Sequence, residues 1–141
     1  MQIAKINQAF FTQNNGLIEA LDEKAGRGYG IAVVTIGNGL KFGIPLRSNM
    51  KHKEGFTTVE RKGLDYSKAI LIDNDAHIGS TFKIPADEYK KIQDREHFIT
   101  GKFQKYVEKY IRSVKKADAN VLREYRFSTL QNYHAQLGCN N

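Results

Sequence analysis

The segment from Pro45 to Lys53, PLRSNMKHK, holds residue types that suit the cleavage of RNA. In that reaction the 2′-hydroxyl attacks the adjacent phosphate, so one group must accept its proton and another must protonate the leaving 5′-oxygen. Cationic donors must also stabilise the charge that develops on the phosphate oxygens. Arginine can bind a phosphate through two hydrogen bonds, and lysine acts as a point charge or an acid–base group. The same residues could equally form an ordinary solvated turn. The polar members of the segment are Arg47, Ser48, Asn49, Lys51, His52 and Lys53.

A second candidate is a row of basic residues at helical spacing in the C-terminal half. Side chains in such a row can follow a phosphate backbone and release its counterions, although a solvated helix face shows the same pattern. The segment from Gly101 to Arg126 has eight basic residues against three acidic ones, so most of the net charge of +7 is local. The residues of this row are Lys102, Lys105, Lys109, Arg112 and Lys116.

The stretch from Lys62 to Lys68, KGLDYSK, places polar residues directly before a predicted strand. Tyr66 could stack on a base and Lys68 could contact a phosphate, while the alternative is a plain turn. Because one turn fits both interpretations, the stretch is only a supporting candidate for an RNA site.

No pattern in the sequence indicates a metal or a cofactor. The four histidines are scattered, and only His52 gains weight from its position in a polar loop. Asp73 and Asp75 come nearest to the clustered carboxylates of a metal-dependent nuclease, and a turn after a strand explains them better. The one cysteine and the histidines have no zinc spacing. We therefore expect any chemistry here to proceed without a metal or cofactor.

The length of 141 residues suits one domain spanning 1–141. Forty per cent hydrophobic residues, with eight Phe and seven Tyr, can build a core and argue against a disordered chain. No apolar run approaches the ~18 residues of a membrane-spanning helix, so no membrane partner is expected. The first residues, MQIAKINQAFFTQNN, lack the pattern of a secretory signal, which favours the cytoplasm.

The hydrophobic pattern changes from a strand period to a helix period near residue 83. Gly37-Asn38-Gly39 separates the two strongest strands and predicts a hairpin. These patterns predict an α+β fold in which helices pack on an antiparallel sheet or half-open barrel. Strands are predicted over 2–6, 29–36, 40–46, 57–60, 69–72 and 81–84. Helices are predicted over 8–21 (with an interruption at Asn14-Asn15-Gly16), 86–93, 98–114 and from Ser128 to near Gly138.

The order of these features resembles the endoribonuclease toxins of type III toxin–antitoxin systems, the ToxN/AbiQ superfamily, and within it the TenpN branch. Three segments carry the resemblance, and together with the basic row they span about residues 29 to 137. They are LKFGIPL running into RSNMKHK, then KGLDYSKAILI, and finally YRFSTLQNYHAQL.

The first family motif reads approximately Pro-Leu-Thr-Ser-Pro-Lys and is followed shortly by His. Pro45-Leu46 and Ser48 match it, whereas Arg47 stands in place of Thr and Asn49 in place of the second Pro. The family's Lys falls one residue before Lys51 in an ungapped alignment. The resemblance implies that Ser48 and Lys51 belong to the cleavage site.

The resemblance also implies a fold and a biological role. Such toxins have a twisted antiparallel sheet with surrounding helices, akin to the Kid/MazF fold. They cut RNA, mRNA included, without a metal, and the products carry 2′,3′-cyclic phosphate and 5′-hydroxyl ends. A small RNA of tandem pseudoknot repeats neutralises them in closed toxin–RNA assemblies, a system used in phage defence by abortive infection. No DNA partner is expected.

The implied roles divide between catalysis and RNA binding. Ser48 would orient the 2′-hydroxyl, while Arg47 and Lys51 would stabilise the transition state. His52 is the fourth residue assigned to the catalytic site, where it would also hold the backbone together with Asn49 and Lys53. Tyr66 and Lys68 would contact the flanking nucleotide, and the basic row at 102–116 would bind the antitoxin RNA.

Two other classes of function fit the residues themselves. One is a non-catalytic RNA- or DNA-binding module that uses the basic row and has an inert loop at 45–53. The other is an interaction domain whose basic face meets an acidic protein. Strand scission separates the first of these from a nuclease, and the absence of co-purified nucleic acid would favour the second.

Overall fold

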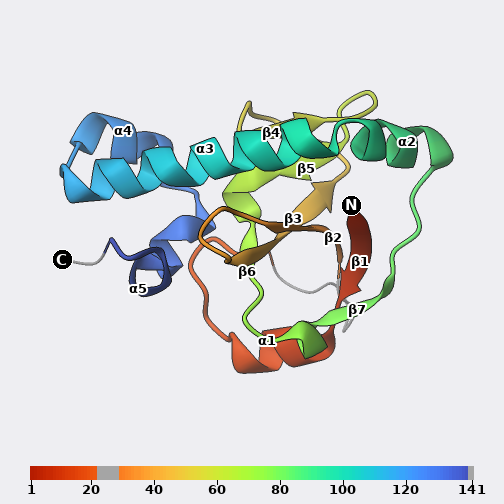
Figure 1. Cartoon of the computed structure of the whole chain (residues 1–141), viewed down its shortest axis with the longest axis horizontal. Helices are drawn as coiled ribbons and strands as arrows, with labels where there is room; N and C mark the ends of the chain where they lie inside the picture. Colours follow the sequence, from red (N-terminus) through yellow and green to blue (C-terminus); the bar gives the residue numbers. More distant parts are fainter. Residues whose placement is uncertain (22–28, 140–141) are drawn as a thin grey trace.

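The computed structural model describes residues 1–21 and 29–139. Its strands form an antiparallel sheet in the order β4-β5-β3-β2-β1-β7, and β6 pairs with β3 outside this path (Figure 1). The predicted α+β class, with helices around an antiparallel sheet and a helical C-terminal half, is confirmed. The strands are β1 (Gln2–Ile6), β2 (Gly30–Thr35), β3 (Lys41–Arg47), β4 (Gly55–Thr57), β5 (Gly63–Asp65), β6 (Ile70–Leu71) and β7 (Ile78–Thr81). The helices are α1 (Gln8–Gln13), α2 (Ala86–Asp94), α3 (Glu96–Lys115), α4 (Ala119–Glu124) and α5 (His134–Leu137), with 3₁₀ turns η1 (Tyr66–Lys68), η2 (Asp75–His77) and η3 (Thr129–Asn132).

Strand β3 is the centre of the sheet. Along one edge its first five residues pair with β2, from Thr35 opposite Lys41 to Ile31 opposite Pro45. Its other edge is shared, because the first half pairs with β6 and the last two residues pair with β5. Arg47 therefore ends β3 directly opposite Gly63, two residues before the end of β5. This register brings together the two polar segments that the sequence analysis singled out, residues 45–53 and 62–68.

The two faces of the sheet bury separate apolar clusters. Helix α3 lies across one face, and α1 lies on the opposite side (Figure 1). Because neighbouring strand residues point to opposite faces, Ile31 belongs to the α1 side and Ala32 to the α3 side. On the α3 side the Phe103 ring packs against Phe42 and Tyr66, with ring centroids 5.2 and 5.3 Å apart. Packing on α3 thus fixes the sheet that carries the polar strand ends.

Local chemistry explains where the elements differ from the prediction. The helix expected over 8–21 ends at Gln13, where Asn14 is the C-cap and its side chain donates to the Phe10 carbonyl at 3.0 Å. Gly16 then adopts a left-handed φ of 81°, which a helix does not contain. The strands expected over 57–60 and 81–84 are wrong, because β4 and β7 end at Thr57 and Thr81. Strand β5 and helix α4 were not predicted.

The C-terminal helix predicted from Ser128 to Gly138 is two short pieces, η3 and α5. The Ser128 side chain does accept from the Leu130 amide, at 3.2 Å, and Gly138 ends α5 in the left-handed region. The Gln131 amide, however, donates to the carbonyls of Arg126 and Ser128, so the reciprocal capping contact does not form.

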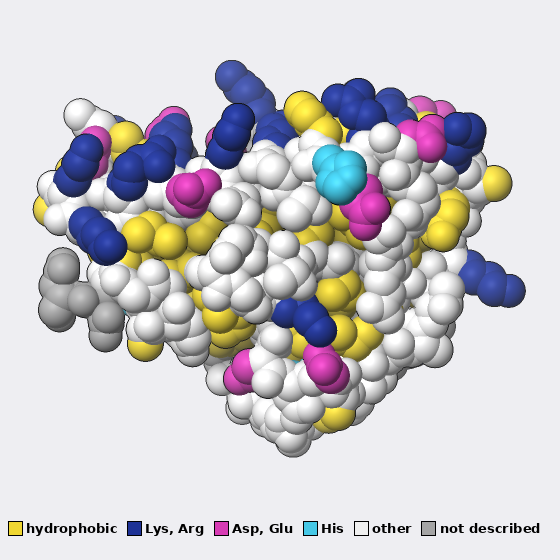
Figure 2. All heavy atoms as spheres, in the orientation of Figure 1, with side chains coloured by type: hydrophobic (Ala, Val, Ile, Leu, Met, Phe, Trp, Pro, Cys, Tyr) yellow, Lys and Arg dark blue, Asp and Glu magenta, His cyan; other side chains and the backbone are white. Residues whose placement is uncertain are grey.

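The basic row occupies the exposed side of α3, as its spacing predicted. Figure 2 shows Lys and Arg side chains gathered along the edge of the molecule that carries α3, α2 and the β4–β5 hairpin. Among residues 1–21 and 29–139, no helix is both long enough and apolar enough to cross a membrane.

The core packing of α3 can be tested with two phenylalanines of that helix. Phe103 is fully buried, whereas Phe98 is 48% exposed. We expect Phe103→Ala to lower the free energy of unfolding by about 3–5 kcal/mol, because it leaves a cavity between helix and sheet. Phe98→Ala should change it by no more than about 1 kcal/mol. Urea denaturation of both variants measures this, and equal losses would contradict the described packing.

Candidate active site

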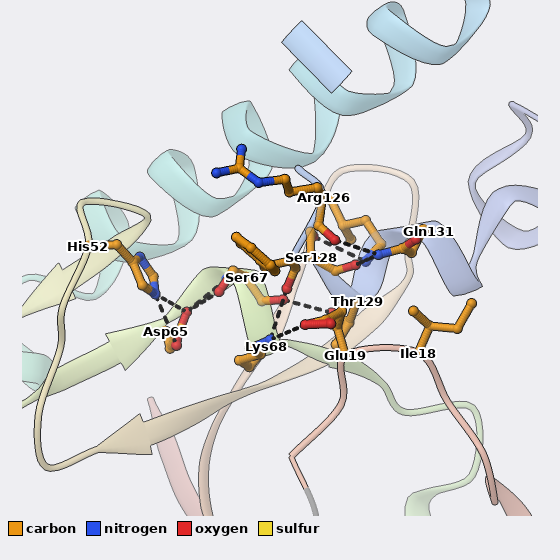
Figure 3. Close-up of polar contacts among 12 residues, drawn as sticks. Ile18, Glu19, His52, Asp65, Ser67, Lys68, Arg126, Ser128, Thr129 and Gln131 are labelled. Carbon is orange, nitrogen blue, oxygen red and sulfur yellow. Dashed lines mark hydrogen bonds and ion pairs between the residues drawn. The ribbon is translucent and has the colours of Figure 1, made fainter. Parts of the chain in front are cut away.

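The carboxylate of Asp65 is the centre of a polar network at the ends of β3 and β5. Its side chain is 1% exposed and accepts from Arg47 Nη1 at 3.1 Å. The His52 Nε2 atom lies 3.2 and 3.3 Å from its two oxygens. The Ser67 amide and hydroxyl donate to Oδ1 at 3.0 and 2.6 Å. Figure 3 shows His52 pointing at Asp65 from one side and Ser67 from the other. A buried carboxylate that accepts hydrogen bonds from an arginine, an imidazole and two groups of one serine is a stable arrangement.

The chain folds this way because three short pieces meet at one place. Asp65 ends β5 and caps the 3₁₀ turn η1, which explains its bond with the Ser67 amide. Arg47 ends the neighbouring strand β3. The loop between β3 and β4 is tied back by the Met50 amide, which donates to the Arg61 carbonyl at 2.7 Å. Because this hydrogen bond turns the loop back on itself, His52 lies against Asp65.

Both ring nitrogens of His52 have partners. The Glu54 backbone N–H donates to Nδ1 at 3.1 Å, so a neutral ring carries its proton on Nε2 and donates it to Asp65. Opening the Glu54 contact would free Nδ1 while Asp65 still held the ring.

The network borders a cleft of about 290 Å³ with a surplus of cationic groups. Lys68, which lines the cleft, donates from Nζ to Glu19 Oε1 at 3.2 Å (Figure 3). It also donates to the Phe127 carbonyl at 2.9 Å, and both partners line the cleft too. Lys51 is exposed and has no ion-pair partner within the described ranges. A concave site with several cations suits a phosphate. The other lining residues are Arg47, Asn49, Met50, His52, Asp65 and Ser67.

Ser48 does not line this cleft, and the expectation that it shares one site with Lys51 is not met. Ser48 directly follows the last residue of β3, Arg47, which lines both this cleft and a second hollow. Ser48 lines that second hollow, of about 420 Å³, together with Lys62 and Glu88. Burial raises the pKa of the Glu88 carboxyl, and the charge of Lys62 lowers it by less. The hydroxyl that touches the network is that of Ser67.

Tyr66 is not available to stack on a base, so that expectation is wrong. Its side chain is 1% exposed, and its hydroxyl donates to the Ile99 carbonyl of α3 at 2.9 Å. Burial raises the pKa of the Tyr66 hydroxyl. The residue after Asp65 thus belongs to the core, and Lys68 is the member of the KGLDYSK stretch that reaches the cleft beside Ser67.

The basic row on α3 is only partly free to meet a ligand. Lys102 donates to the Gly55 carbonyl at 2.7 Å, and Lys109 lies 3.3 Å from Glu124. The remaining three, Lys105, Arg112 and Lys116, are exposed without an ion pair inside the described part of the chain. In the loop, Lys53 is exposed but does not line the Asp65 cleft.

Sequence reasoning missed the role of Asp65, although it singled out the stretch that contains it. The signal was an Asp followed two residues later by Ser, a pattern typical of a side chain that caps its own turn. Glu19 and Phe127 could not be assigned to this cleft, because they come from distant segments.

The described residues contain no group of three or more His, Cys, Asp or Glu side chains placed to hold a metal ion. Asp73 lies 3.9 Å from His77 Nδ1, and Asp75 pairs with Lys41 at 2.9 Å, on a turn away from the cleft. Comparison of the chain with known protein families, with curated proteins and with solved structures gives no match. The resemblance to type III toxins, and to the Kid/MazF fold, therefore stays a prediction.

The network makes Asp65 a residue on which stability depends. We expect Asp65→Asn to lower the free energy of unfolding by about 2–4 kcal/mol, because Arg47 and His52 lose the buried carboxylate between them. Asp73→Asn is the matched control, since Asp73 is exposed beside His77 and should change stability by about 0.5 kcal/mol or less. Chemical denaturation at neutral pH compares the two, and similar stabilities would contradict the network.

Proposed function

We propose that this chain is a metal-independent endoribonuclease that cleaves RNA by attack of the 2′-hydroxyl on the adjacent phosphate. The observation that carries the proposal is the buried Asp65 carboxylate, which orients Arg47 and His52 at one cleft. Lys51 adds a positive charge to the same cleft, and Lys68 lines it in an ion pair with Glu19. These are the components that such a cleavage requires: cations for the phosphate and a held imidazole for the proton.

The proposed reaction begins with the phosphate between Arg47 and Lys51. Arg47 uses one N–H on Asp65, and its other donors bind the non-bridging oxygens. His52 releases the Glu54 amide, and its Nδ1 accepts the 2′-hydroxyl proton while Asp65 stabilises the resulting imidazolium. The Lys51 ammonium protonates the leaving 5′-oxygen. The products are a 2′,3′-cyclic phosphate and a 5′-hydroxyl.

The biological role that we propose rests on the resemblance described above. The chain would act as a type III toxin in the bacterial cytoplasm, with mRNA as its substrate. A repeat pseudoknot RNA would hold it inactive in a closed assembly. The exposed cations Lys105, Arg112 and Lys116 of α3 are suited to bind that RNA.

A second candidate function is a non-catalytic RNA- or DNA-binding module. The observation that favours it is the same exposed side of α3, which needs no chemistry at the cleft to bind a backbone. Both candidates predict binding that weakens steeply with salt, so only strand scission separates them.

The proposed chemistry is tested by incubating purified, RNA-stripped protein with a mixed single-stranded RNA in EDTA. We expect discrete fragments that carry 2′,3′-cyclic phosphates and 5′-hydroxyls. Removing a cation from the transition state should slow cleavage by about 10²–10³-fold in Arg47→Ala and in Lys51→Ala. Lys90→Ala, on α2, removes an exposed lysine that pairs with Asp94 and should cleave like the unaltered protein. RNA that stays intact but bound would favour the non-catalytic module.

The Ser48→Ala variant tests whether the active site is the Asp65 cleft or includes the serine that the family motif implies. Since Ser48 lines the other hollow, we expect its loss to change the cleavage rate by less than about threefold. The same assay in EDTA measures it. A loss as large as that of Lys51→Ala would contradict the assignment of the active site to the Asp65 cleft.

A further inference from the structure

Phe127 is an exposed aromatic ring at the rim of the Asp65 cleft. It is 57% exposed, which is unusual for a phenylalanine, and it lines the cleft together with Lys51 and His52. Among residues 1–21 and 29–139, Phe127 belongs to neither apolar cluster. An exposed ring beside a cationic cleft is a surface on which a nucleobase can stack.

The ring is held in place by contacts on both sides of its backbone. The Lys68 ammonium donates to the Phe127 carbonyl at 2.9 Å, which ties Phe127 to another residue of the cleft lining. The Arg126 guanidinium lies 4.7 Å from the ring centroid and also donates to the Arg123 carbonyl at 2.8 Å. The following amide, that of Ser128, donates to the Tyr125 carbonyl at 2.9 Å. The Phe127 backbone is therefore fixed, and Arg126 packs against the ring that would receive a base.

We propose that Phe127, backed by Arg126, is a stacking platform for a single-stranded RNA base next to the scissile phosphate. The inference rests on the proposed function, since the cleft supplies the phosphate contacts that bring the base to the ring. Arg126 covers one face of the ring, so the base stacks on the other face or on the guanidinium plane. Every base has a π-face, so the platform selects single strands rather than one sequence.

Phe127 takes the base-stacking role that the sequence had suggested for Tyr66. Tyr66 is buried beneath α3, so the cleft has Phe127 as its exposed ring among the lining residues. The two rings come from different segments, and Lys68 joins them, since it closes the η1 turn that begins at Tyr66 and bonds to Phe127.

Binding of a short, fluorescent 2′-O-methyl oligonucleotide tests the platform apart from cleavage, because this RNA has no 2′-hydroxyl to attack. We expect Phe127→Ala to weaken its binding about tenfold or more, and Phe127→Trp to keep the affinity. Phe127→Leu keeps an apolar side chain without a π-face and should bind as weakly as Phe127→Ala. Thermal unfolding of each variant checks that it is folded.

Phe98→Ala is a matched control. Phe98 is also exposed and also carries an arginine, Arg95, 4.5 Å from its ring centroid, but it does not line the cleft. We expect its affinity to stay within about twofold of the unaltered protein. A 2-aminopurine base in the oligonucleotide should lose fluorescence on stacking, and this quenching should vanish in Phe127→Ala and persist in Phe98→Ala.

Three results would overturn the platform: unchanged affinity in Phe127→Ala, full affinity in Phe127→Leu, or an equal loss in Phe98→Ala. Failure of the proposed function would look different. If the unaltered protein binds the oligonucleotide through Phe127 but leaves ordinary RNA intact in EDTA, the platform is supported and the nuclease is not.

Discussion

A carboxylate that is 1% exposed must recover from its neighbours the hydrogen bonds that water would make, and Asp65 does so at the meeting point of three chain segments. Arg47 comes from the end of β3, His52 from the loop that follows, and Ser67 from the turn after β5. If any of these segments moved, the carboxylate would lose a partner in a place that water barely reaches. The burial of one charge thus fixes the strand ends, the loop and the shape of the cleft together.

The sheet supports this site through the residue next to it. Asp65 and Tyr66 are neighbours, but the first serves the cleft while the second is buried beneath α3, where it bonds to Ile99 and packs on Phe103. A single peptide bond therefore joins Tyr66, which is fixed in the core, to Asp65, which holds the polar network together. Sites held by packed elements keep their geometry better than sites on free loops. This link explains why a short strand of three residues, β5, can position a charged group.

Sequence patterns predicted the parts of the fold that depend on local signals. The β-branched run of β2, the Gly-Asn-Gly turn and the helical period of α3 each contain enough residues to be recognised. Strand β5 has only three residues, which is too short to show an alternating hydrophobic pattern. Its first residue, Gly63, cannot carry a side chain, because a Cβ atom there would lie 2.4 Å from the Phe56 carbonyl oxygen. Phe127 reaches the cleft through Lys68, a contact over 59 positions that no local pattern encodes. The role of Ser48 stays a prediction, because a family motif gives the order of residues and not the hollow that each one lines.

The central claim is that the cleft uses the 2′-hydroxyl of its substrate as the nucleophile, with cations and an imidazole held by Asp65 in place of a metal. The most direct measurement compares two RNAs that differ at a mapped cleavage position, where one carries the ordinary ribose and the other a single 2′-deoxyribose. We expect cleavage at that position to disappear in the second RNA while neighbouring positions are still cut, in EDTA, with 2′,3′-cyclic ends. Continued cutting at the 2′-deoxy position would show that water attacks the phosphate instead and would contradict the claim.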